Sequence, residues 1–114
     1  MLQHLSKKLF IERIADYTSS DRWDFKVSVP TLIVFHTEIH LYEKGFRDVY
    51  DTLVEKFPLL KCYEVLENED PEIAAAYLIK DFPATMFIST SEKAFVKSGY
   101  LTPDEAIADV QKIY

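Results

Sequence analysis

The stretch "PTLIVFHTEIHLYEKGF" (residues 30–46) decides the fold that this chain is expected to adopt. Its first half is a nearly continuous apolar, β-branched run, as in a strand buried on both faces. Pro30 fits such a strand only at its start. Helical spacing begins near position 43. The stretch therefore predicts a buried strand with His36 at its end, and then a helix with His40 at or near its start. Such strand ends often carry the functional site of α/β proteins.

Hydrophobic periodicity predicts the other elements. Helices are expected within residues 5–17, with Ser6 as a candidate N-cap, and within 43–57, 68–79 and 102–114. In the third of these, Asp70 is the expected N-cap and Pro71 the first helical residue. Further strands are expected at residues 59–67, 84–89 and 94–99, and a short strand or extended segment at residues 23–28. Thr102 and Glu105 have the spacing of a capping box, with Pro103 at the first helical position. The short connection between the last two strands predicts an antiparallel hairpin. A βαβ unit followed by a ββα unit predicts an α/β fold with one mixed central sheet and helices on both faces.

Length and composition narrow the class of protein. With 114 residues we expect a single domain, in which residues 1–22 form an N-terminal helix and turn and residues 23–114 form the core. The net charge of −6 argues against nucleic acid or an anionic membrane as a partner. No segment approaches the ~20 apolar residues of a membrane span. The N-terminus also has no apolar stretch long enough for a signal peptide, so we expect a cytoplasmic protein.

Four segments together resemble the thioredoxin family, particularly its bacterial branch with an extended N-terminal helix. They are "RWDFKVSVP" (22–30), "PTLIVFHTE" (30–38), "EDPEIAAAYLIKDFPATMFI" (69–88) and "VKSGYLTPDEAI" (96–107). Each is weak alone, but their order and spacing are fairly specific, and they cover nearly the whole chain. The resemblance implies a thioredoxin-like three-layer α/β/α sandwich with a central mixed β-sheet. Fold alone does not establish function, which depends on the residues of the site.

The chain departs from the thioredoxin pattern at the residues that carry redox chemistry. The two cysteines of the family align with His40 and Glu43. The buried carboxylate that assists proton transfer aligns with Val34, and the proline that kinks the following helix aligns with Asp48. Dithiol exchange needs one thiolate to attack and a second thiol to resolve the mixed disulfide. We therefore predict a redox-inactive domain without dithiol–disulfide oxidoreductase activity and without a cofactor.

The sequence also leaves open metal binding, acid–base chemistry and a thiol-dependent activity. His36 and His40 are candidate metal ligands, but they do not lie on one helix, so their spacing of four carries little weight. His40 and Glu43 could support a distinct acid–base chemistry at a helix start. Cys62 could support a thioredoxin-like oxidoreductase or another thiol-dependent activity. A cysteine in a predicted strand is more often a small buried hydrophobic residue.

The resemblance also implies a groove for a protein partner. In the family, the residue that aligns with Pro83 is a cis-proline beside the redox loop, and its neighbouring backbone pairs with an extended segment of the partner. The residues expected around this groove are Ile39, His40, Leu41, Tyr42, Phe82, Pro83, Gly99 and Tyr100. Aromatic residues beside an open backbone suit peptide binding by strand addition. The leading hypothesis is a redox-inactive protein that binds a polypeptide, as an adaptor or a chaperone-like module, in an oligomeric state that the sequence does not predict.

Overall fold

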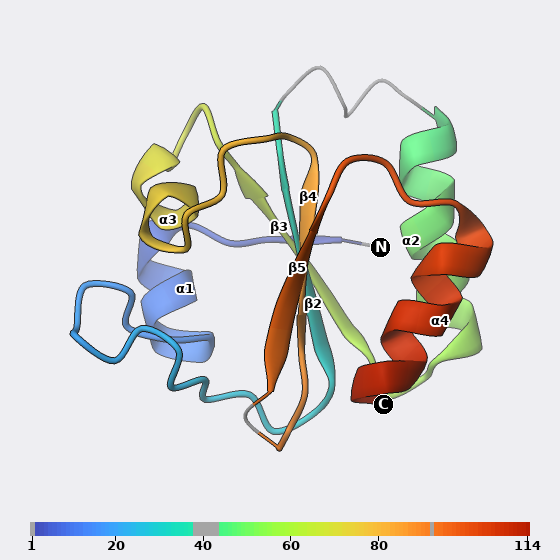
Figure 1. The fold of residues 1–114 in the computed structure, drawn as a ribbon, viewed down its shortest axis with the longest axis horizontal. Helices are drawn as coiled ribbons and strands as arrows, with labels where there is room; N and C mark the ends of the chain where they lie inside the picture. Colours follow the sequence, from blue (N-terminus) through green and yellow to red (C-terminus); the bar gives the residue numbers. More distant parts are fainter. Residues whose placement is uncertain (1, 38–43, 92) are drawn as a thin grey trace.

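The computed structural model describes residues 2–37, 44–91 and 93–114, whose elements form three layers (Figure 1). The strands are β1 (Gln3–His4), β2 (Thr31–His36), β3 (Lys61–Leu66), β4 (Ala84–Ile88) and β5 (Ala94–Ser98). The helices are α1 (Lys7–Arg13), α2 (Lys44–Lys56), α3 (Pro71–Ala76) and α4 (Pro103–Ile113). Figure 1 shows α1 and α3 on one face of the sheet and α2 and α4 on the other. The predicted α/β/α sandwich is confirmed.

The central sheet has the strand order β1-β3-β2-β4-β5. Strand β3 pairs in parallel with β1 and β2, whereas β4 pairs antiparallel with β2 and β5, so the sheet is mixed as predicted. All six residues of β2 are buried, which explains why its sequence is almost continuously apolar. The pairing of Phe35 with Ala84 places the end of β2 beside the start of β4.

Residues 23–28, expected to form a short strand or an extended segment, do not form a strand of the sheet. Their alternating aromatic residues pack against a helix layer instead of pairing in the sheet. The ring centroids of Trp23 and Phe25 lie 5.1 and 6.2 Å from that of Tyr77, and the Lys26 amide donates to the Ile14 carbonyl at 2.7 Å. The place beside β3 belongs to β1, which periodicity could not reveal because it has two residues.

Two of the predicted helices are shorter than expected. Helix α1 occupies Lys7–Arg13 of the predicted 5–17, and its N-cap Ser6 accepts a hydrogen bond from the Leu9 amide at 3.3 Å. Helix α3 (Pro71–Ala76) follows the N-cap Asp70 and has Pro71 at its start, as predicted, but it ends before the predicted residue 79. Leu78 adopts a positive φ of 60° just after α3, a conformation that cannot continue a right-handed helix. The capping box of Thr102 and Glu105 forms as predicted at the start of α4.

The hydrophobic core has two parts, one on each face of the sheet. Ile33 and Phe35 of β2 pack with residues of α1 and α3. Leu32 and Val34, which alternate with them, pack with residues of α2 and α4. Strand β2 therefore contributes to both parts of the core and contacts both helix layers. Its position also sets the positions of the segments at its two ends.

Candidate binding groove at the ends of β2 and β4

Phe82, Pro83, Gly99 and Tyr100 meet where β4 begins and β5 ends, at the upper end of the sheet in Figure 1. The Phe82–Pro83 peptide bond is cis. The Gly99 amide donates a hydrogen bond of 2.7 Å to the Pro83 carbonyl. This bond joins the segment just before β4 to the segment just after β5. Gly99 has a φ of 90°, a conformation that favours glycine. The structure therefore brings these four predicted groove residues together.

The rest of the predicted groove lies outside the described residues. This applies to Ile39, His40, Leu41, Tyr42 and Glu43. The described chain stops at Thr37, just after β2, and resumes with α2. Because β2 ends beside the start of β4, Thr37 and Pro83 belong to the same end of the sheet.

A hollow of about 350 Å³ lies between α2 and the connection from β5 to α4. Its largely apolar lining includes Phe46, Val49, Tyr50, Tyr100, Leu101 and Pro103. The Tyr100 ring is 57% exposed and meets the Phe46 ring edge-on at a centroid distance of 6.1 Å. The contribution of α2 to this hollow was missed, because helical periodicity does not show which apolar residues of a helix stay uncovered. An apolar group from another molecule could enter this hollow and contact Val49 and Tyr100.

The position that corresponds to the family's buried carboxylate is fully apolar in this chain. Val34 is completely buried and pairs across the sheet with Thr85. The Thr85 hydroxyl forms a buried hydrogen bond of 2.9 Å with the Tyr50 hydroxyl. Burial raises the pKa of Tyr50 to about 12, so this phenol keeps its proton at neutral pH. A neutral hydroxyl pair therefore lies beside Val34.

The candidate metal ligand His36 is part of the core. Its side chain is completely buried, with its ring 5.3 Å from that of Phe46. Its Nε2 lies 3.8 Å from a Glu64 carboxylate oxygen, and the same oxygen lies 3.8 Å from Nδ1 of His4. Within the described part of the chain, no group of three or more His, Cys, Asp or Glu residues is arranged to hold a metal ion.

Cys62 lies in β3 with only 5% of its surface exposed, packed in the core on the α2 side. Burial raises the pKa of its thiol to about 12. Because the thiolate is the reactive form of cysteine, a thiol with this pKa is a poor nucleophile at neutral pH. Lys61 is exposed, whereas Cys62 is not, as expected for neighbours on opposite faces of a strand.

Comparisons with known proteins establish the fold. No protein-family profile matches the sequence, and a search of curated proteins finds no match. Among solved structures, the chain is similar to the crystal structure of chloroplastic thioredoxin z, with a TM-score of 0.72 and 14% sequence identity. The similarity covers 98% of this chain and 93% of that chain. The fold is therefore thioredoxin-like, as the resemblance implied. No helix among the described residues is long and apolar enough to cross a membrane.

The buried Tyr50–Thr85 pair allows a test by a double-mutant cycle. Tyr50→Phe leaves the Thr85 hydroxyl buried without this partner, so we expect it to lower the free energy of unfolding by about 1–2 kcal/mol. Thr85→Val, which strands the Tyr50 hydroxyl, should have a similar cost. The double variant removes both polar groups and should lose less than the sum of the two single losses. Urea unfolding measures all four free energies, and strictly additive losses would contradict the pairing.

The burial of Cys62 predicts that its thiol reacts slowly with alkylating reagents. A pKa of about 12, against an ordinary value of 9.0, leaves about a thousandfold less thiolate at pH 8. We expect Cys62 in the folded protein to react with iodoacetamide at least about a thousandfold more slowly than in the same protein unfolded in urea. Mass spectrometry of timed samples gives both rates. Comparable rates in the two states would show that the thiol is accessible and activated.

Proposed function

We propose that this protein binds a polypeptide partner through the groove formed by Phe82, Pro83, Gly99 and Tyr100, without thiol–disulfide exchange. The observation that carries the proposal is the backbone of Phe82, which has no backbone hydrogen bond among the described residues, at the same end of the sheet as the exposed Tyr100. An extended segment of the partner would add to the backbone at Phe82, and one of its apolar side chains would pack against Tyr100.

The backbone of Phe82 is available for such pairing. The ladder between β4 and β5 begins at Ala84, and Gly99 bonds to the carbonyl of Pro83. Phe82 itself makes no backbone hydrogen bond to another of the residues that the structure describes. Unpaired N–H and C=O groups along the edge of an extended segment are the groups that strand addition uses.

The apolar hollow beside Tyr100 supplies the side-chain part of the interaction. Exposed tyrosines next to concave apolar surface are frequent energetic centres of protein interfaces. The crystal structure of chloroplastic thioredoxin z is described as defining a type-specific target recognition in that protein. We propose that recognition of a protein target is also the role of this chain.

The partner would be held by non-covalent contacts alone. The chain has one cysteine, and it is buried with a raised pKa. Val34 supplies no carboxylate for proton transfer. The alternative, a thiol-dependent activity, would require Cys62 to leave the core. A distinct chemistry at His40 and Glu43 stays a hypothesis, because both residues lie outside the described chain.

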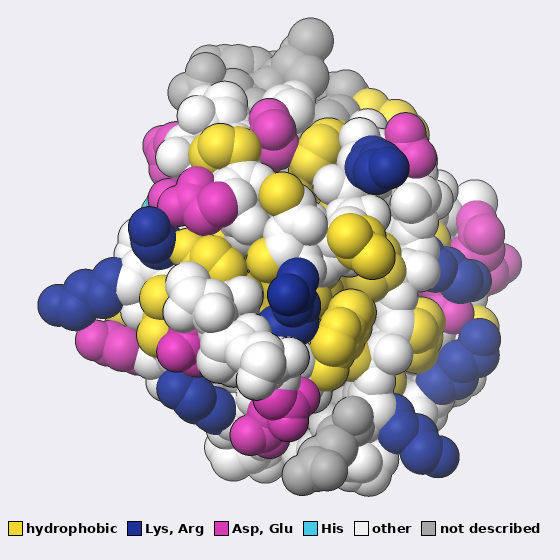
Figure 2. All heavy atoms as spheres, turned by 60° about the vertical axis from the view of Figure 1, so that its left-hand side comes forward, with side chains coloured by type: hydrophobic (Ala, Val, Ile, Leu, Met, Phe, Trp, Pro, Cys, Tyr) yellow, Lys and Arg dark blue, Asp and Glu magenta, His cyan; other side chains and the backbone are white. Residues whose placement is uncertain are grey.

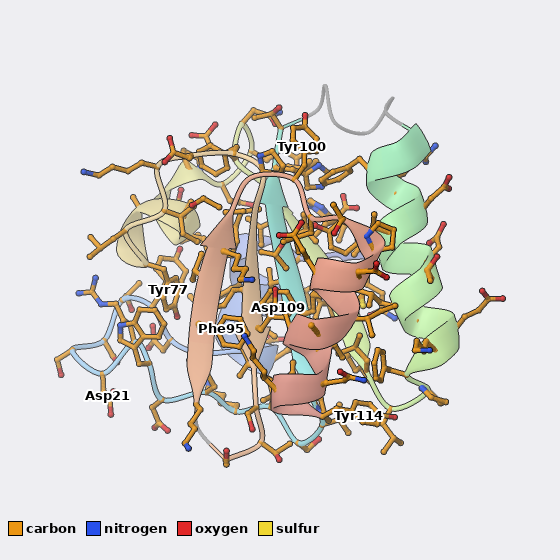
Figure 3. The ribbon with its side chains drawn as sticks, turned by 45° about the vertical axis from the view of Figure 1, so that its right-hand side comes forward. Asp21, Tyr77, Phe95, Tyr100, Asp109 and Tyr114 are labelled. Carbon is orange, nitrogen blue, oxygen red and sulfur yellow. The ribbon has the colours of Figure 1, made fainter. Side chains whose placement is uncertain are left out.

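The groove can be tested with one matched control. Figure 3 shows Tyr100 and Tyr114 at opposite ends of the molecule, and the two residues are 57% and 49% exposed. Partners are first captured from the source cell and identified, and the affinity of a purified partner is then measured by calorimetry. We expect Phe82→Ala and Tyr100→Ala to weaken binding about tenfold or more, the loss typical of an interface centre. Tyr114→Ala should bind like the wild type.

Two other results would contradict the proposal. If all variants bind the same partner equally well, the groove is not the binding surface. If the wild type reduces insulin disulfides and Cys62→Ala does not, the protein is a thiol-dependent enzyme. Circular dichroism of each variant checks that a lost interaction does not reflect a lost fold.

A further inference from the structure

A second hollow, of about 590 Å³, lies at the other end of β2 from the groove. It is bounded by the starts of β2 and β3, the end of α1 and residues 26–29. Three cationic residues from three separate segments line it: Arg13, Lys26 and Lys61. We name it the Arg13–Lys61 pocket. Its volume falls within the range of small-molecule sites, about 300–1,000 Å³.

The charge of this pocket is opposite to that of the chain. The chain has a net charge of −6, yet three positive residues and one negative residue, Glu12, line the pocket. Over the face shown in Figure 2, acidic and basic side chains are interspersed. A concave surface with an excess of one sign attracts ligands of the opposite sign. The pocket is therefore suited to an anion.

Two of the three cations have no anionic partner among the described residues. In residues 2–37, 44–91 and 93–114, neither Arg13 nor Lys61 takes part in an ion pair. The third cation, Lys26, donates from Nζ to the Ile11 carbonyl at 2.8 Å. An anion in the pocket would thus meet Arg13 and Lys61 without displacing an existing ion pair.

Two carboxylates limit how strongly the pocket attracts an anion. Glu12 lines it directly. The pKa of Asp16 is lowered by hydrogen bonds from Thr18 and also by the charge of Lys26, so Asp16 partly compensates Lys26. The attraction therefore rests mainly on the other two cations, and the carboxylate of Glu12 works against it.

We propose that the Arg13–Lys61 pocket binds a small phosphate-bearing anion. Arginine matches the oxygens of a phosphate with a fixed fork of donors, and lysine adds a point charge. Ser28 also lines the pocket, and its hydroxyl can donate a further hydrogen bond. The pocket is larger than a phosphate group alone, and Val27 and Tyr63 in its lining can contact an organic part of the ligand. The proposal is independent of the partner-binding groove.

The test is a titration of the ¹⁵N-labelled full-length protein, followed by amide chemical shifts. The probes are ribose 5-phosphate, inorganic phosphate and, as the uncharged comparison, ribose. We expect saturable shifts in residues 26–29 and 61–63 with the two phosphates and none with ribose. Tighter binding of ribose 5-phosphate identifies a phosphate ester as the ligand class. Equal binding of the two identifies the free anion.

Four charge variants test which residues bind the anion. Arg13→Gln and Lys61→Gln should each weaken binding about tenfold or more, because each removes a charge-assisted contact. Glu12→Gln should tighten binding, because it removes the opposing charge. Lys80→Gln changes an exposed lysine outside the pocket and should have no effect. Shifts that do not saturate, that ribose also produces, or that persist unchanged in both Arg13→Gln and Lys61→Gln would overturn the proposal.

Discussion

The complete burial of strand β2 is the constraint on which the rest of the structure depends. Its two edges pair with β3 and β4, and its two faces supply residues to both parts of the core. A slip of one residue would exchange Ile33 and Phe35 with Leu32 and Val34 between the helix layers, so the register is firmly set. The fixed register brings the end of β2 beside Pro83 and its start beside Lys61, the two places where we propose binding.

Much of the fold could be predicted from local patterns, and the errors arose where packing decides the structure. The apolar run of β2 and the capping box at Thr102 are local signals, and both were interpreted correctly. Strand β1 has too few residues to show a period. The alternation of Trp23 and Phe25 reflects contact with Tyr77, more than 50 residues away, and no local pattern distinguishes that contact from pairing in a sheet.

The candidate sites were predictable to different degrees. Phe82, Pro83, Gly99 and Tyr100 came from the resemblance to thioredoxins, and the structure brings them together. The hollow beside Tyr100 was missed, because the periodicity of α2 does not show which apolar residues stay uncovered. The Arg13–Lys61 pocket joins three cationic residues from three segments that only the folded chain places around one hollow.

The central claim is that the thioredoxin-like groove binds a protein partner although thiol exchange is absent. Hydrogen–deuterium exchange of the free protein and of its complex with a captured partner tests this claim most directly, because it locates contact at backbone amides. We predict that the amides of Phe82, Ala84 and Tyr100 exchange more slowly in the complex. Unchanged exchange at these residues, with protection confined to another surface such as the Arg13–Lys61 pocket, would contradict the claim.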